Sequence, residues 1–381
     1  MGTATHQTSV QARGALRAWR NFLAGACALA LSAAFVSPAL AADDWQEGAG
    51  ADWQAMLAKA KTEGCVVLSM GAPVGEKFAE AFQRDTGVKL DFLGGTTQTV
   101  QARFMREVES ANLTIDIQIG GSGELALPRD QMQPIQPLLV LPKVKDGKYW
   151  TDGHIFYIDS QRMYFPQAAD YVSFRVFANA DKVNVADLKK FEDLLDPKYK
   201  GKIVSADPTG MAGGQGFSEG VMNSRGAEFL EKLYKGQDIR LSRNGTQLVE
   251  MAVRGTNPIV IGALQADIDK FVSQGFNLQY VDFADWPNYS TGGRSVVKMP
   301  KNAPHPNAAA VFVNWFLSKP GQELYEELLQ EPSRRTDVAH KGIPSYMFLK
   351  PGIDYIETYN EEYITKLRPV VNKKMMEIFN K

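Results

Sequence analysis

The chain has 381 residues, of which 44% are hydrophobic and 22% charged, and its formal net charge is −1 at pH 7. This composition is sufficient for a full globular core, and the near-neutral charge gives no electrostatic footprint for nucleic acid or an anionic membrane. With only 2 cysteines, the chain cannot be a small scaffold held together by several disulfide bonds.

The first 41 residues predict a cleaved secretory signal. Three arginines and no acidic residue precede an apolar run over residues 22–36, and the small residues Ala39 and Ala41 then occupy the −3 and −1 positions. This order is typical of a signal cut after Ala41, and the apolar run is shorter than the roughly 20 residues of a membrane span. A lipoprotein signal at Cys27 and a twin-arginine signal are poorer matches. We therefore expect a protein that works outside the cytoplasm.

Removal of these 41 residues from the 381 leaves 340, which is enough for two domains. The loss of three arginines takes the net charge from −1 to −4. Cys65 is the one cysteine that stays, so no intramolecular disulfide can form. Its place in an apolar run favours a small buried strand residue over a reactive thiol.

The first part of the mature chain alternates helices and strands. In chain order we expect a helix over 53–61, a strand over 65–70, a helix around 78–82, a strand over 88–93, a helix around 100–108 and a strand over 114–119. Each strand opens onto a loop rich in glycine or threonine. This pattern predicts an α/β layer with a parallel sheet, in which ligands bind beyond the carboxyl ends of the strands.

A second α/β block begins near residue 171. The expected elements are a helix over 186–195, strands over 202–206 and 258–261, a helix over 227–234, a strand over 295–299, a helix over 308–317 and an amphipathic helical segment over 355–381. We interpret the last segment as packing rather than function.

Four separated segments carry a family resemblance. They are Ala58–Val67 with Gly71-Ala72-Pro73, Ile115-Asp116-Ile117 with Gly121-Ser122-Gly123-Glu124, Asp196–Ile203 with Asp207-Pro208, and Ala308–Ser318 with Gly321-Gln322-Glu323. In this order they resemble the extracellular solute-binding proteins of bacterial ABC importers. The nearest branch includes binders of ferric ion, thiamine and aminoethylphosphonate.

The resemblance implies a two-lobe periplasmic binding protein of type II, an α/β fold in which each lobe is a mostly parallel sheet flanked by helices. The implied division is a signal peptide over 1–41, a first lobe over 42–168 plus 284–335, a second lobe over 169–283, and a C-terminal helical segment over 336–381 that packs on the lobes. Chain crossings fall near 165–175 and 280–286, with a hinge between the lobes. The implied partners of this monomer are a small-molecule ligand and an ABC permease, with no cofactor and no nucleic acid.

In the first lobe, the expected ligand-binding residues lie in the three loops after the strands. They are Gly71, Ala72, Thr96, Thr97, Gly121 and Ser122. Glycine allows close backbone approach, and hydroxyl and free N–H groups bind oxyanions or polar head groups. The same glycines would also serve tight strand-to-helix turns, and both interpretations stay open.

In the second lobe, the glycine-rich stretch before an expected helix suits an anion, because the N–H groups at a helix start have no partner. The expected ligand-binding residues here are Gly213, Gly214, Gln215, Arg243 and Asn244, together with Tyr171 and Trp286 near the crossings. The glycines could instead form a flexible loop, Arg243 a surface charge, and the two aromatic residues part of the core.

Iron is a less favoured ligand. The mature chain has no adjacent pair of tyrosines. The ferric-ion binders of this branch that use a paired-tyrosine motif place such a pair in the second lobe. Ferric iron requires anionic oxygen ligands, and no such set is visible in the sequence. A small organic or phosphorylated anion is therefore expected, and ferric ion is the alternative.

Enzyme functions find little support. Residues 216–220 match the Gly-x-Ser-x-Gly pattern around Ser218, but the stretch before this serine is not the strand that a nucleophile elbow requires. The mature chain's 3 histidines lack metal-ligand spacing. A secreted serine hydrolase is thus a distant alternative, and a periplasmic ligand-sensing partner of a receptor remains open.

Overall fold

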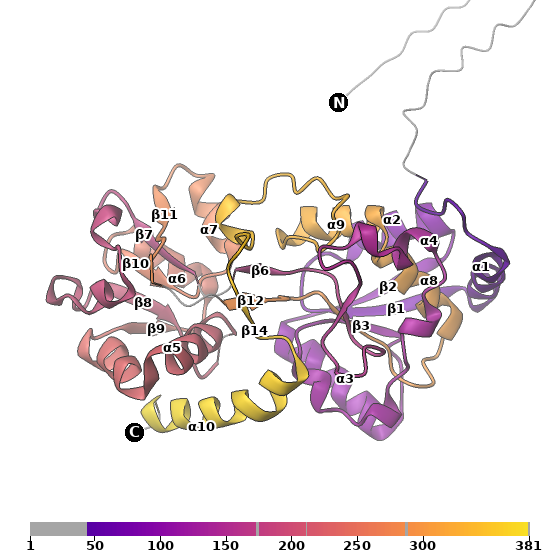
Figure 1. Ribbon diagram of the computed structural model, residues 1–381, viewed down its shortest axis with the longest axis horizontal. Helices are drawn as coiled ribbons and strands as arrows, with labels where there is room; N and C mark the ends of the chain where they lie inside the picture. The colour runs from indigo at the N-terminus through magenta and orange to yellow at the C-terminus, as the bar shows by residue number, and fades with distance from the viewer. Residues whose placement is uncertain (1–43, 173–174, 211, 286–288, 380–381) are drawn as a thin grey trace, which may run out of the picture. The chain divides into compact units, whose positions relative to one another are not determined.

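The computed structural model describes residues 44–172, 175–210, 212–285 and 289–379 (Figure 1). The chain divides into a first unit, Met1–Asp44, and a second, compact unit, Trp45–Lys381. The expected signal over 1–41 lies outside the described residues. Among the helices of the described ranges, none has both the length and the apolar composition of a membrane span.

Helices of the described chain flank the sheets on the outside. The α-helices are α1 (Ala51–Glu63), α2 (Gly75–Thr86), α3 (Thr97–Ser110), α4 (Pro142–Lys145), α5 (Ala212–Glu231), α6 (Gly245–Val253), α7 (Gln265–Val272), α8 (Pro306–Phe316), α9 (Lys319–Leu329) and α10 (Arg368–Phe379).

The first sheet has the strand order β2-β1-β3-β13-β5-β4. Its strands are β1 (Cys65–Met70), β2 (Lys89–Gly94), β3 (Ile117–Gly120), β4 (Phe156–Tyr157), β5 (Pro166–Gln167) and β13 (Val296–Lys298). β1 runs parallel to β2 and β3, whereas β13 is antiparallel to both β3 and β5.

The second sheet has the order β11-β7-β10-β8-β9. Its strands are β7 (Val176–Asn179), β8 (Ile203–Ala206), β9 (Arg240–Ser242), β10 (Ile259–Ile261) and β11 (Leu278–Tyr280). β8 is parallel to β9 and β10, but β7 pairs antiparallel with β10 and β11.

A third, small sheet joins the two large ones, and we call it the linking sheet. Its strands are β6 (Tyr171–Val172), β12 (Tyr289–Thr291) and β14 (Ile356–Glu357), in the order β14-β12-β6. β6 follows β5 of the first sheet and precedes β7 of the second, while β12 follows β11 and precedes β13. The chain therefore passes through the linking sheet once in each direction, and β14 brings the C-terminal segment to the same place (Figure 1).

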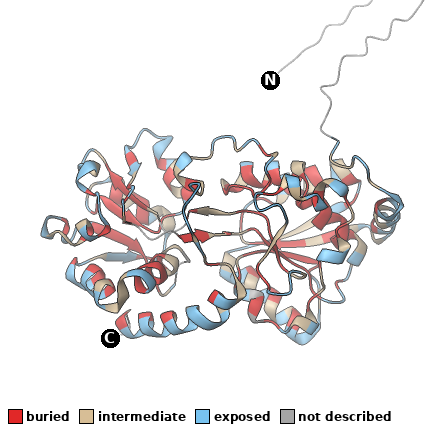
Figure 2. Ribbon diagram, in the orientation of Figure 1, coloured by how far each residue is buried: buried red, intermediate tan, exposed pale blue. Residues whose placement is uncertain are grey.

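The apolar cores form because successive side chains of a strand point to opposite faces of its sheet. In the second sheet, Val176 and Ala178 face one apolar cluster while Phe177 between them faces the other, so both faces of the sheet are covered. Beside the first sheet, every residue of α8 from Ala308 to Phe316 is buried, as expected for a helix without a polar face. Figure 2 shows the buried strands inside and the exposed helix faces outside.

The expected α/β class is confirmed, but the sheets are mixed rather than mostly parallel. The reason is the linking sheet: β7 and β13 each enter their sheet directly from a linking strand, without the helical crossover that a parallel neighbour needs.

The helix expected over 186–195 is also corrected to two short 3₁₀ helices, Val185–Asp187 and Phe191–Leu195. The carboxylate of Asp193 accepts hydrogen bonds from the backbone N–H groups of Lys189 and Lys190, which competes with a continuous helix.

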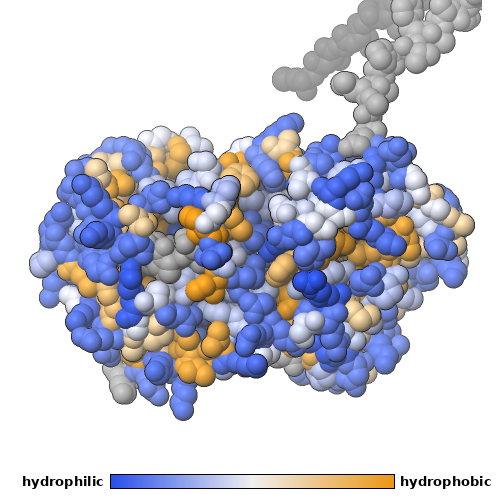
Figure 3. Space-filling model, viewed as in Figure 1, coloured by the Kyte–Doolittle hydropathy of each residue, from blue (hydrophilic) through white to orange (hydrophobic). Residues whose placement is uncertain are grey.

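The C-terminal segment contacts elements around both large sheets. Glu361 forms an ion pair with Arg129 at 2.8 Å on the side of the first sheet. In α10, Val371, Met375 and Ile378 join the apolar core below the second sheet. The outer face of this segment carries the exposed side chains Leu367, Val370 and Met376, and Figure 3 shows apolar atoms gathered over α10.

Candidate functional site

Three loops leave the first sheet at one edge, because β2, β1 and β3 run parallel. They carry the expected ligand-binding residues Gly71, Ala72, Thr96, Thr97, Gly121 and Ser122. The first two loops touch, since a Cβ atom at residue 71 would lie 2.6 Å from the Cα of Thr97. Glycine at position 71 therefore allows the two loops to meet.

Several side chains of these loops have structural partners. Thr96 is the N-cap of α3, and its hydroxyl accepts a hydrogen bond from the N–H of Thr99 at 3.2 Å. Ala72 is buried. Ser122 is 3% exposed, and its hydroxyl accepts a hydrogen bond from the distant Arg368. Gly121 lies close to the hydroxyl of Tyr359.

On the second sheet, Gly213, Gly214 and Gln215 form the first turn of α5 instead of preceding the helix. A Cβ atom at residue 213 would overlap the carbonyl oxygen of Gly262, and one at residue 214 would overlap that of Ala206. The two glycines thus let the helix start directly on the ends of β8 and β10. Composition alone indicates a flexible loop here, because helix propensity does not register this close packing.

Arg243 and Asn244 lie at the start of α6. The Nε of Arg243 donates to Asp207 at 2.7 Å, and its side chain is 70% exposed. The burial of Asp207 would raise its pKa, but hydrogen bonds from Thr209 and Arg243 outweigh burial, so its pKa is lowered. Asn244 caps α6 by accepting a hydrogen bond from the N–H of Gln247. Both side chains have local structural roles.

Tyr171 lies in β6, with its hydroxyl close to Gly293 and to the carboxylate of Glu331. The guanidinium of Arg175 stands over its ring at 5.5 Å from the centroid. Burial, and then the charge of Glu331, raise the pKa of this phenol well above its usual value, so it stays neutral. The aromatic partner expected with it, Trp286, lies outside the described residues.

Arg368, the first residue of α10, connects a loop of the first sheet to helix α5 beside the second sheet. Its Nη1 donates to the hydroxyl of Ser122 at 3.2 Å, and its Nε donates to the carboxylate of Glu219 in α5 at 3.2 Å. The amide of Gln215 donates to the other oxygen of Glu219 at 3.1 Å. Ser122 and Gln215, expected on opposite sides of a ligand, are therefore joined through one arginine and one carboxylate.

Glu219 is a buried charged group, with 1% of its surface exposed. Burial raises the pKa of its carboxyl group, while the nearby Arg368 opposes this rise. Tyr363 also donates a hydrogen bond to this carboxylate, at 3.4 Å. Such a carboxylate remains inside a protein only with charged and hydrogen-bonding partners, which these residues provide.

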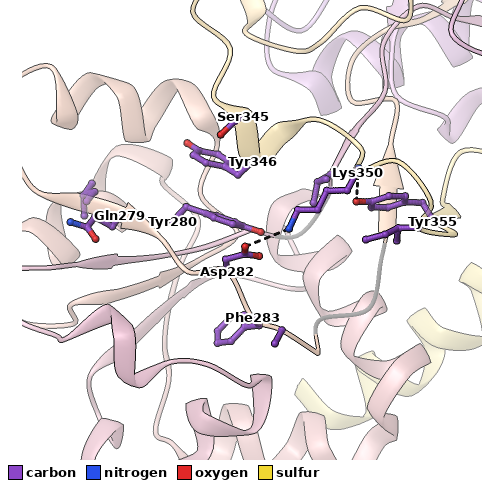
Figure 4. A pocket seen from close by; sticks show the side chains of 12 residues that line it. Gln279, Tyr280, Asp282, Phe283, Ser345, Tyr346, Lys350 and Tyr355 are labelled. Carbon is purple, nitrogen blue, oxygen red and sulfur yellow. Dashed lines mark hydrogen bonds and ion pairs between the residues drawn. The ribbon is translucent and has the colours of Figure 1, made fainter.

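A separate cavity of about 870 Å³ lies between β11 and residues 345–355 (Figure 4). The rings of Tyr280 and Tyr346 stack at its wall, with centroids 4.5 Å apart. Lys350 and Asp282 form an ion pair across it at 3.4 Å. Burial, with a contribution from Asp282, raises the pKa of Tyr280 to about 12. Of the expected ligand-binding residues that the structure describes, none lines this cavity.

Ser218 lies inside α5 and is fully buried, with its hydroxyl donating to that of Tyr234 at 3.2 Å. This is a packed helix position and not a strand-to-helix elbow. Within the described residues, no group of three or more His, Cys, Asp or Glu side chains is arranged to hold a metal ion.

The sequence did not indicate Arg368, Glu219 or the tyrosines of the cavity. Arg368 lies 246 residues from Ser122 in a segment interpreted as packing. Charged residues of an amphipathic helix carry no signal that tells an inward-facing arginine from a solvated one.

The family of bacterial extracellular solute-binding proteins matches this chain over residues 77–346. The match covers more than half of the chain, so the chain belongs to this family, as the resemblance implied. It is a solute-binding protein and not an enzyme.

Individual relatives are more distant. A Salmonella paratyphi A protein, provisionally named as a 2-aminoethylphosphonate-binding periplasmic protein, is 24% identical over 270 residues, which are 68% of this chain and 73% of that protein. The fold is similar to that of iron-bound HitA from Pseudomonas aeruginosa, with 18% identity, a TM-score of 0.59 and coverage of 83% of this chain and 99% of HitA. It is also similar to the periplasmic binding protein AfuA from Actinobacillus pleuropneumoniae with fructose-6-phosphate bound, with 22% identity, a TM-score of 0.57 and coverage of 83% and 98%. At these identities the two structures show the fold alone.

Proposed function

We propose that the protein captures a small anionic organic or phosphorylated solute between two lobes and delivers it to the permease of an ABC importer. The first lobe comprises residues 42–168 with 284–335, and the second comprises 169–283. Residues 336–381 pack on both lobes. The working form is a periplasmic monomer released from its signal peptide, in line with the periplasmic relatives.

One observation carries the proposal. Ser122, from a loop of the first sheet, and Gln215, from α5 beside the second sheet, are connected through Arg368 and Glu219. A loop of the first sheet and the first turn of α5 thus approach the same ion pair, where a hydroxyl and a guanidinium lie side by side. These are groups that recognise oxyanions.

The names of the relatives agree with an anionic solute. Of the three, one is named for a phosphonate and one structure contains a sugar phosphate, and both solutes carry a phosphorus oxyanion on an organic group. The third relative, HitA, holds iron, so ferric ion is included in the test below. Nothing among the described residues favours a metal over an anion.

A thermal-shift screen tests the proposal. The exported, processed protein would be heated with 2-aminoethylphosphonate, fructose 6-phosphate, inorganic phosphate, citrate, a polyamine and ferric citrate in parallel. A ligand at 100 times its dissociation constant stabilises the folded state by about 2.7 kcal/mol, which is a rise of several degrees. We expect such a rise with at least one organic or phosphorylated anion. A rise with the polyamine alone, or with ferric citrate but not citrate, would contradict an anionic solute.

A further inference from the structure

The C-terminal segment supplies a cation that contacts Ser122, one of the expected ligand-binding residues. Arg368 donates to Ser122 and Glu219, and its Nη2 donates to the carbonyl oxygen of Thr358 at 3.4 Å. Its side chain is 20% exposed, so it remains reachable from solvent. This residue lies beyond the part of the chain that the family match covers, residues 77–346.

We propose that Arg368 receives the anionic group of the solute, and that Glu219 is the resident counter-ion with which the solute competes. This inference rests on the proposed function and names the residue that determines its preference for anions.

The donor geometry of Arg368 supports this role. A guanidinium has five N–H groups, and the three hydrogen bonds to described residues use one on Nε and one on each terminal nitrogen. Among the described residues, the second N–H of each terminal nitrogen has no partner. These two N–H groups can donate to the oxygens of a carboxylate, phosphonate or phosphate, the anions that arginine recognises.

Glu219 explains how the arginine is held before a solute arrives. Gln215 and Tyr363 position this buried carboxylate beside the guanidinium, at 3.1 Å and 3.4 Å from its two oxygens. A second anion at Arg368 must share the guanidinium with it. Removing the charge of Glu219 should therefore tighten anion binding, and removing the charge of Arg368 should weaken it.

The opposite signs separate this proposal from a simpler one. If the ion pair between Arg368 and Glu219 only holds α10 against α5, then replacing either residue loosens the same contact. A purely structural role therefore predicts that Arg368→Gln and Glu219→Gln shift the affinity for the anion in the same direction.

Isothermal titration calorimetry on the exported protein would test this with each anion of the screen. We expect Arg368→Gln to lower affinity at least about tenfold, Arg368→Lys to lose less, and Glu219→Gln to raise it about threefold or more. Arg129→Gln is the matched control, because it breaks another arginine–carboxylate pair that holds the C-terminal segment, the pair with Glu361. It should stay within twofold of the wild type.

An affinity of Arg368→Gln within twofold of the wild type would overturn the inference, as would a loss of similar size in Glu219→Gln. If Arg368→Gln melts well below the wild type, its affinity is no test of the inference. The affinity of the folded Arg368→Lys variant, and whether Glu219→Gln raises or lowers affinity, then decide between the two explanations. A wild-type protein that binds no anion of the screen would instead refute the proposed function, and the inference would fall with it.

Discussion

The Oδ2 of Asp116 lies 2.8 Å from the Nδ1 of His305, although 189 residues separate the two in the chain. The same carboxylate accepts hydrogen bonds from the backbone N–H groups of Val67 and His305, at 2.8 and 2.7 Å. Asp116 is fully buried. It thus joins β1 to the segment that starts α8, after the chain has returned from the second sheet.

Replacing Asp116 with alanine should destabilise the protein by about 2–4 kcal/mol, because three donors lose a buried acceptor. Urea unfolding followed by tryptophan fluorescence would measure this loss. Glu80→Gln, at an exposed position in α2, is the control and should stay within about 0.5 kcal/mol. A midpoint unchanged by Asp116→Ala would show that the junction does not depend on this carboxylate.

The first turn of α5 predicts a second effect. Gly214→Ala should cost about 1–3 kcal/mol, since its methyl group would overlap the carbonyl oxygen of Ala206. Gly236→Ala adds its methyl group in open space and should be nearly neutral. Thermal melts of the two variants would compare them directly. Equal melting temperatures would mean that the helix does not sit on the strand end as described.

Glu219 predicts a pH dependence of stability. Burial raises the pKa of its carboxyl group, opposed by Arg368, above the roughly 4.3 of an unfolded glutamate. Its stabilising contribution is therefore present below the unfolded pKa and is lost as the pH rises through the folded pKa. Because glutamine does not titrate, the Glu219→Gln variant does not lose this stability as the pH rises.

Whatever the constant cost of the Glu219→Gln substitution, the variant should gain stability relative to the wild type as the pH rises from 4 toward 8. Melting temperatures of both proteins across this range would show the trend. A constant difference, or one that moves in favour of the wild type, would mean that Arg368 outweighs burial at this site.

The leader predicts a defined amino terminus. Processing after Ala41 should give an exported protein that begins at Ala42, which intact-mass spectrometry would detect. Ala41→Arg should leave the precursor uncut, because the −1 position requires a small residue. An exported protein that retains residues before 42 would contradict the predicted cut.

Local pattern was enough to predict much of the first sheet. The strand expected over 65–70 matches β1, and that over 88–93 is within one residue of β2. The third strand begins later than expected, at Ile117, because the carboxylate of Glu107 binds the N–H groups of Thr114 and Ile115 and draws them out of the sheet. Such tertiary hydrogen bonds leave no trace in apolar periodicity.

The arrangement of the expected ligand-binding residues was less predictable for the same reason. Loops at strand ends could be identified, and Ser122 and Gln215 contact the two partners of one ion pair, Arg368 and Glu219. Their connection, however, depends on Arg368 in α10, which packs on α5 through apolar contacts. Among the other expected residues, Thr96 and Asn244 carry helix-capping roles that the sequence alone does not separate from ligand binding.

The most direct measurement is a crystal structure of the exported protein with the anion that raises its melting temperature most. We predict density for that anion between the first-sheet loops and α5, within hydrogen-bonding distance of Ser122 and Arg368. Density only in the cavity beside Tyr280 and Tyr346, or only on the outer surface, would contradict capture of the solute between two lobes.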